Sequence, residues 1–215
     1  MTKSILLKSR PEGTPSVSNF EFVTDEKSLS AGSGEILVEA AYVSVDPYLR
    51  GRMSDAKSYI EPFEIGKPIH SGVVAKVIAS NNDAFKEGDY VSGMLDWATA
   101  QVHTGEGLLK VDPSKASLSA YLGILGMTGL TAFLGLHEIG KPVAGETLVV
   151  SGAAGAVGSV VGQIGKILGL RVVGIAGTDE KVAMLKDKFG FDAAINYNTT
   201  DDMAAAIKTA APDGV

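Results

Sequence analysis

Cysteine is absent from this 215-residue sequence, and histidine occurs only three times. Without cysteine the chain can form no disulfide bond and no thiolate-bound metal site. The three histidines, His70, His103 and His137, lie far apart and show no spacing typical of metal ligands. We therefore expect no metal site.

Long apolar runs and clusters of positive charge are also missing. No run approaches the roughly 18 apolar residues of a membrane-spanning helix, and residues 1–5 do not resemble a secretory signal. Lysine and arginine are scattered, and the net charge is −6, which argues against nonspecific nucleic-acid binding. We expect a cytoplasmic protein that binds neither nucleic acid nor membranes.

The first part of the sequence, up to about residue 122, contains short β-like runs between turn signals. Several such runs at this spacing predict a small, mostly antiparallel barrel. The turn at 86–89 places Gly88 where a positive φ is expected. The clearest runs are residues 36–43, 73–79 and 90–94.

Residues 123–215 instead alternate between strand and helix patterns. The apolar segment 121–139, which Gly140 and Pro142 follow, predicts a first helix. Alternation predicts βαβ units and a parallel sheet; the expected strands are 147–151, 171–176 and 193–197, and the expected helices are 157–168, 179–189 and 201–211. A doubly wound dinucleotide-binding sheet has six strands. We therefore expect the chain to be the first part of a longer protein and to be inactive by itself.

A glycine-rich segment, Gly152-Ala-Ala-Gly155-Ala-Val-Gly158, follows the strand at 147–151 and opens a helix. In this context it predicts a pyrophosphate site: Gly155 permits close backbone approach, Gly158 permits close helix packing, and free N–H groups at the helix start hold the anion. Ala153 stands where the common pattern has its first glycine. The alternative is a helix start whose small residues serve packing alone.

The end of the second strand of this unit indicates the cofactor. Sites for NAD place an acidic residue there to accept from the ribose 2′-hydroxyl, but this strand ends in Ile175-Ala-Gly-Thr178. Asp179 and Glu180 follow at the expected helix start, where carboxylates cap the helix and complement its dipole. Lys181 and the Thr178 hydroxyl suit a 2′-phosphate. We therefore expect NADP(H), the alternative being that Lys181 is an ordinary solvated helix residue.

Several segments along the chain resemble the medium-chain dehydrogenase/reductase superfamily. The similarity is to its zinc-free branch of leukotriene B4 12-hydroxydehydrogenase, prostaglandin reductase and alkenal double-bond reductases. The resemblance rests on four segments: Tyr42-Val-Ser-Val-Asp-Pro-Tyr-Leu-Arg-Gly-Arg-Met53, Leu122-Gly-Ile-Leu-Gly-Met-Thr-Gly-Leu-Thr-Ala-Phe133, Val150-Ser-Gly-Ala-Ala-Gly-Ala-Val-Gly-Ser159 and Gly177-Thr-Asp-Glu-Lys181.

The resemblance implies an α/β protein in which a GroES-like, mostly antiparallel β-barrel domain (1–122) precedes an incomplete Rossmann doubly wound sheet (123–215). It implies a homodimer when full length. It also assigns residues to sites: Gly155, Ala156, Val157 and Gly158 to the pyrophosphate loop, Gly177, Lys181 and Tyr197 to the 2′-phosphate, Met127 and Thr128 to the nicotinamide end, and Tyr48 to the substrate cleft.

Zinc-dependent members of the superfamily carry a metal histidine where this sequence has Pro68. With no cysteine as well, the zinc alcohol-dehydrogenase mechanism is excluded. Nearby His70 either lines the cleft or, as we favour, is a loop histidine with satisfied hydrogen bonds. Arg50 and Arg52 are expected to form salt bridges rather than to act in catalysis.

The resemblance implies hydride transfer from NADPH to the β-carbon of an α,β-unsaturated ketone or aldehyde. The developing enolate needs hydrogen-bond donors, and its α-carbon then needs an acid or water. Tyr48 is the candidate catalytic residue, either as a donor to the substrate oxygen or merely packed under its turn. Residues 54–66 are expected to form a cleft-side loop that tunes substrate choice. A quinone reductase of the same superfamily and a non-catalytic NADPH-binding protein stay open as alternatives.

Overall fold

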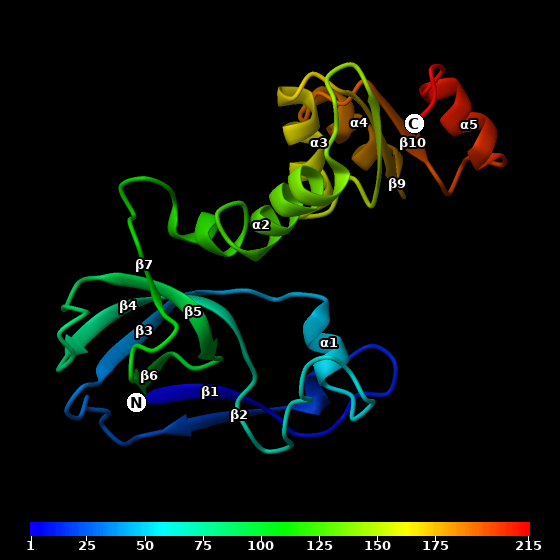
Figure 1. Ribbon diagram of the computed structural model, residues 1–215. Helices are drawn as coiled ribbons and strands as arrows, with labels where there is room; N and C mark the ends of the chain where they lie inside the picture. Colours follow the sequence, from blue (N-terminus) through cyan, green and yellow to red (C-terminus); the bar gives the residue numbers. More distant parts are fainter. The chain divides into compact units, whose positions relative to one another are not determined.

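The computed structural model describes residues 1–215, which divide into two compact units, Met1–Leu122 and Gly123–Val215 (Figure 1). Each unit has an apolar core of its own. None of the helices in the structure combines the length and the apolar character needed to cross a membrane.

The first unit is built on a five-stranded sheet in the order β6-β3-β4-β5-β7, and every neighbouring pair is antiparallel. The core lies on one face of this sheet, where Val38, Val73 and Val91 are almost completely buried. The strands are β3 (Ile36–Val43), β4 (His70–Ser80), β5 (Tyr90–Asp96), β6 (Ala100–His103) and β7 (Leu109–Val111).

A second, two-stranded antiparallel sheet joins β1 (Thr2–Leu7) to β2 (Phe20–Asp25) after the short 3-10 turn η1 (Val17–Asn19). Isolated bridges from Ser4 to Ala98 and from Leu6 to Pro68 tie β1 to the larger sheet. The short helix α1 (Tyr48–Arg52) covers a separate apolar cluster that includes Leu49 and Phe63. The expected mostly antiparallel domain is therefore confirmed.

The strands expected from the sequence agree closely with those observed in this unit. The strand at 36–43 has the predicted bounds, whereas β4 and β5 extend beyond the predicted runs. Gly88 has a φ of +92°, as expected for the turn at 86–89.

The second unit has a three-stranded parallel sheet in the order β10-β9-β8. Helices pack on the strands that flank them, as Figure 1 shows for α3 and α4, and Val172, Leu185 and Phe191 form the centre of the core. This confirms the expected Rossmann-type sheet. The elements are β8 (Thr147–Ser151), α3 (Gly158–Ile167), β9 (Arg171–Ala176), α4 (Asp179–Asp187), β10 (Ala193–Asn196) and α5 (Met203–Ala210).

The single helix expected over 121–139 is wrong. The structure has a 3-10 turn, η2 (Leu118–Leu122), then α2 (Met127–Leu134) and a π-helical turn, η3 (Gly135–Gly140). The interruption arises because the carbonyl of Gly123 accepts hydrogen bonds from the N–H groups of Gly126 and Gly129, at 3.0 and 3.1 Å, and thereby closes a turn. Sequence periodicity could not reveal this turn, because the glycines lie within an otherwise continuous apolar run.

Candidate functional site

The glycine segment forms a tight turn between β8 and α3. Gly152 has a φ of +60°, so the left-handed position of the turn falls on this residue. Ala153, at the position of the pattern's usual first glycine, is completely buried. A Cβ on Gly158 would lie 2.5 Å from the Gly152 oxygen and 2.8 Å from the Ala153 Cα. Only glycine at 158 therefore lets the helix begin so close to the turn.

Two backbone donors of this turn have no hydrogen-bond partner. The N–H groups of Ala156 and Val157 donate no hydrogen bond within the chain, whereas Gly155 N–H is used in closing the turn on the Gly152 oxygen at 2.9 Å. Free donors at the start of a helix attract an anion, because the helix dipole adds to their partial charge. The turn thus fits a pyrophosphate.

The neighbouring strand β9 ends in a second corner. Ser151 and Ile175 are register partners, and the N–H of Ala153 bonds to the Ile175 oxygen at 3.0 Å, so the two corners lie at the same edge of the sheet. At the β9 corner the Tyr197 side chain lies directly over Gly177, where a Cβ would be only 2.5 Å from the phenol oxygen. Gly177 therefore leaves room for the tyrosine ring, which is half-exposed.

Lys181 lies in the first turn of α4 at this corner. Its backbone N–H bonds to Thr178 Oγ1 at 3.3 Å, which makes Thr178 the N-cap of the helix. Its ammonium group forms no ion pair in the structure. The structure therefore brings Tyr197 against Gly177 and places Lys181 one helical turn after this corner, capped by Thr178 and without an ion pair.

The expectation that Asp179 and Glu180 cap this helix needs correction, since the cap is Thr178. Glu180 does interact with the helix start: a hydrogen bond from its own backbone N–H, followed by one from the Thr178 hydroxyl, holds the pKa of its carboxyl below the ordinary value. Asp179 instead accepts a hydrogen bond from Asn196 Nδ2 at 2.7 Å. Sequence reasoning did not single out Asn196, because a lone asparagine at the end of a short strand gives no recognisable pattern.

Met127 and Thr128 begin α2, which packs against α3. Met127 is half-exposed, and the Thr128 hydroxyl donates to the Gly123 oxygen at 3.0 Å. The structure shows no hydrogen bond between either residue and the glycine turn. Their assignment to the nicotinamide end stays a prediction.

Tyr48 belongs to the other unit, where it begins α1 after Pro47. Its ring packs beside the apolar cluster that contains Leu49 and Phe63. Burial, reinforced by the carboxylate of Asp46, raises the pKa of its phenol. The group therefore keeps its proton at neutral pH and can act as a hydrogen-bond donor.

The salt bridges expected for Arg50 and Arg52 are not found. Arg50 donates to the Gly13 and Pro11 carbonyl oxygens at 2.8 and 3.0 Å. Arg52 is only 6% exposed; its Nε donates to the Glu61 oxygen at 3.0 Å, and one amino nitrogen has no hydrogen-bond partner. The sequence prediction of salt bridges is therefore wrong for both residues, because backbone carbonyl oxygens that the folded chain brings near are their partners.

The buried Arg52 stands among aromatic groups. Its guanidinium carbon lies 4.1 Å from the centre of the Phe63 ring, which also meets His70 edge-on at 5.2 Å between ring centres. His70 begins strand β4, so the expectation of a loop histidine is wrong. Burial, followed by the charge of Arg52, lowers the pKa of His70, and its imidazole is neutral at neutral pH.

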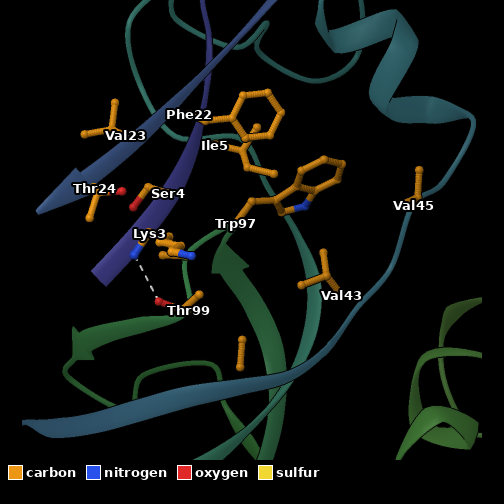
Figure 2. A pocket seen from close by; sticks show the side chains of 12 residues that line it. Lys3, Ser4, Ile5, Phe22, Val23, Thr24, Val43, Val45, Trp97 and Thr99 are labelled. Carbon is orange, nitrogen blue, oxygen red and sulfur yellow. Dashed lines mark hydrogen bonds between the residues drawn. The ribbon is translucent and has the colours of Figure 1, made fainter. Parts of the chain in front are cut away.

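A cavity of about 500 Å³ lies in the first unit between β1–β2 and the larger sheet, lined by Phe22, Val43 and Trp97 among others (Figure 2). The indole of Trp97 donates to Ser71 Oγ at 2.8 Å. No predicted site residue lines this cavity, and Lys3 is its one titratable side chain. It therefore offers apolar contact but little acid–base chemistry.

A parallel sheet with a glycine turn after one strand and a cationic corner after the next defines a Rossmann dinucleotide-binding unit. Residues 3–111 match the family described as the N-terminal domain of oxidoreductase, and residues 156–215 match the family described as zinc-binding dehydrogenase. The chain belongs to the medium-chain dehydrogenase/reductase superfamily, in its zinc-free branch.

Individual relatives support this placement. The chain is 54% identical to a Bacillus subtilis protein named as an NADP-dependent oxidoreductase, YfmJ, over 99% of its own length and 62% of the relative's. It is 45% identical to the NADP⁺-dependent 2-alkenal reductase of Nicotiana tabacum, over 99% of the chain and 63% of the relative. It superposes on CurA in complex with NADPH from Vibrio vulnificus with a TM-score of 0.90 and 43% identity, over 99% of the chain and 63% of that structure. The chain thus spans slightly less than two thirds of the relatives it matches, and the expected cofactor agrees with the one in their names.

The zinc in the family description does not fit this chain. The sequence has no cysteine, and the structure contains no group of three or more histidine, aspartate or glutamate side chains placed to hold a metal ion. The residues that could bind a cofactor are those of the two corners in the second unit.

Proposed function

We propose that this chain forms part of an NADPH-dependent reductase that saturates the carbon–carbon double bond of α,β-unsaturated ketones or aldehydes. The observation that carries the proposal is the corner after β9, where Lys181 is unpaired and Tyr197 covers Gly177. The names of the relatives, which include a 2-alkenal reductase and an NADPH-dependent curcumin reductase, support it.

In the proposed binding mode, the N–H groups of Ala156 and Val157 hold the pyrophosphate, and Lys181 and Tyr197 hold the 2′-phosphate. Gly155 and Gly158 allow the backbone to approach. Bound NADPH would supply the hydride. Met127 and Thr128 are proposed to lie near its nicotinamide end.

Tyr48 is proposed to donate a hydrogen bond to the substrate oxygen. Its raised pKa keeps the phenol protonated, which favours donation to an oxygen that gains negative charge. The hydride adds at the β-carbon and a proton from an acid or water adds at the α-carbon, so the net change is the addition of two hydrogens across the double bond. The neutral His70 and the segment 54–66 are proposed to lie beside this substrate.

Cofactor preference tests the proposal directly. The full-length protein that contains this chain should consume NADPH when a small enone is added, and NADH should support a much lower rate. Lys181→Ala should weaken NADPH binding about tenfold or more, since a charge-assisted contact contributes roughly 1.5–3 kcal/mol, and should leave NADH binding nearly unchanged. Lys186→Ala, a change of another exposed lysine on α4, is the matched control. Equal affinity of the unaltered protein for NADPH and NADH would refute the assignment of Lys181.

A quinone reductase is the second candidate. The chain is 26% identical, with a TM-score of 0.74, to a Pseudomonas syringae quinone oxidoreductase. A panel of enones and quinones distinguishes the two activities. Tight NADPH binding without turnover of either class would instead indicate a non-catalytic cofactor-binding protein.

A further inference from the structure

Two carboxylates stand beside the proposed 2′-phosphate site, where they would repel the ligand if left free. Asp179 and Glu180 directly precede Lys181, and both are exposed. The surroundings of Glu180, its own backbone N–H first and then Thr178, lower the pKa of its carboxyl and so favour its charged form. The other carboxylate, Asp179, is held by Asn196, the last residue of β10. Asn196 Nδ2 donates to Asp179 Oδ1 at 2.7 Å.

The orientation of the Asn196 amide is set by its own surroundings. Its Oδ1 accepts the backbone N–H of Asn198 at 3.0 Å, so its amino group is the end that points to Asp179. The Asn196 backbone pairs with Ala176 in the parallel ladder, and its carbonyl accepts from the Thr200 hydroxyl at 2.7 Å. Asn196 is therefore a fixed donor.

The same loop also holds the backbone of the corner. Asn198 Nδ2 donates to the Gly177 oxygen at 2.6 Å, and Tyr197 covers Gly177 between the two asparagines. The segment 196–198 thus contacts both the glycine and the carboxylate that precede Lys181.

We propose that Asn196 is a positioning residue for cofactor selection, because its hydrogen bond keeps the Asp179 carboxylate away from the ligand's 2′-phosphate. This rests on the proposed NADPH function and extends it. With that bond broken, the Asp179 side chain turns freely at the start of α4, shortly after the end of β9, where NAD-binding sites use an acid to accept from the 2′-hydroxyl. Asn196 therefore favours the phosphorylated cofactor by removing a competing acid, while Lys181 favours it by attraction.

The role of Asn196 is tested by equilibrium binding of two probes, adenosine 2′,5′-bisphosphate and AMP. The probes differ only in the 2′-phosphate, and their binding needs no turnover. Asn196→Ala should weaken binding of the bisphosphate about tenfold and leave AMP binding unchanged or slightly tighter. Adding Asp179→Asn to that variant should restore bisphosphate binding to within about twofold, because the freed acid is then gone. Asp179→Asn alone should leave it unchanged or tighter.

Two results would overturn the proposal: bisphosphate binding that stays weak in the double variant, or AMP binding that falls as much as bisphosphate binding in Asn196→Ala. Either result would mean that Asn196 acts only by supporting the loop. If Asn196→Ala fails to fold, as circular dichroism would reveal, Asn196→Ser is measured in the same pairs. An unaltered chain that binds AMP as tightly as the bisphosphate would refute the NADPH assignment itself, which is a distinct outcome.

Discussion

The two units place their candidate functional groups in different ways. In the second unit the groups at the glycine turn are backbone N–H donors, whose positions follow from where glycine stands in a βαβ unit. In the first unit the candidate is a side chain, Tyr48, whose pKa depends on what packs around it. A glycine pattern in the sequence therefore predicts a site, whereas a single tyrosine predicts only a candidate residue.

The largest loss of stability should come from adding a side chain at Gly158, where α3 begins against the backbone of the glycine turn. Gly158→Ala places a methyl group against the backbone of Gly152 and Ala153, and neither can move without opening the turn. We expect a loss of about 3 kcal/mol in unfolding free energy, measured by urea denaturation, together with loss of NADPH binding. Gly135→Ala, at a helical position with open space around it, is the matched control and should be neutral or slightly stabilising. Equal losses in both variants would contradict the close-packing argument.

In the first unit, the buried Arg52 tests how far stability depends on side-chain packing. Arg52→Ala removes a buried side chain, its bond to the Glu61 oxygen and its contact with Phe63, and should cost roughly 2–3 kcal/mol. Arg52→Met keeps most of the volume and removes the unpaired buried nitrogen, so it should cost only about 1 kcal/mol. Hydrogen exchange of peptides from residues 1–122 measures both. If methionine proves as damaging as alanine, the charge matters more than the packing.

The carboxylate of Asp192, in the second unit, should make the free energy of unfolding fall in acid. Burial by itself raises the pKa of Asp192, but hydrogen bonds from Lys166, at 2.7 and 2.8 Å, and from the Val172 N–H, at 2.6 Å, outweigh it and hold the pKa below the ordinary value. Because the folded state favours the charged form, this stabilisation is present above the unfolded pKa and is lost as the pH falls through the folded one.

Asp192→Asn should therefore cost about 1–2 kcal/mol at neutral pH. The difference from the unaltered chain should disappear in acid, which urea denaturation at a series of pH values would show. A difference that is independent of pH would mean that charge has no part in the effect.

The first unit contains the opposite case, with the smallest expected effect. Burial raises the pKa of Asp96, and His70 and His103 offset this only in part. The penalty for the charged form is absent below the unfolded pKa and complete once the pH exceeds the folded one. Asp96→Asn should thus stabilise the first unit by up to about 1 kcal/mol at neutral pH and have no effect in acid. Destabilisation at neutral pH would show that the carboxylate has a favourable partner.

Sequence patterns predicted the parallel unit closely: the strands at 147–151 and 171–176 have the expected bounds. Buried strands next to turn glycines are local signals, which explains this success. The expected helix over 121–139 was wrong, because a turn closed by Gly123 carbonyl hydrogen bonds is invisible to apolar periodicity. The burial of Arg52 could not be predicted either, since it depends on Phe63 and Glu61, which only the folded chain brings near. The Asn196–Asp179 bond joins residues 17 positions apart and has the same origin.

Trp97, whose indole is bonded to Ser71, is the one tryptophan of the sequence. Light absorbed selectively by indole is therefore emitted from the unit Met1–Leu122 alone. Far-ultraviolet ellipticity, by contrast, is dominated by helices, and the long ones, α2 to α5, all lie in the other unit. Indole fluorescence thus follows unfolding of the first unit, and far-ultraviolet ellipticity mainly follows unfolding of the second. Recording both signals during one thermal denaturation gives the order in which the two units unfold.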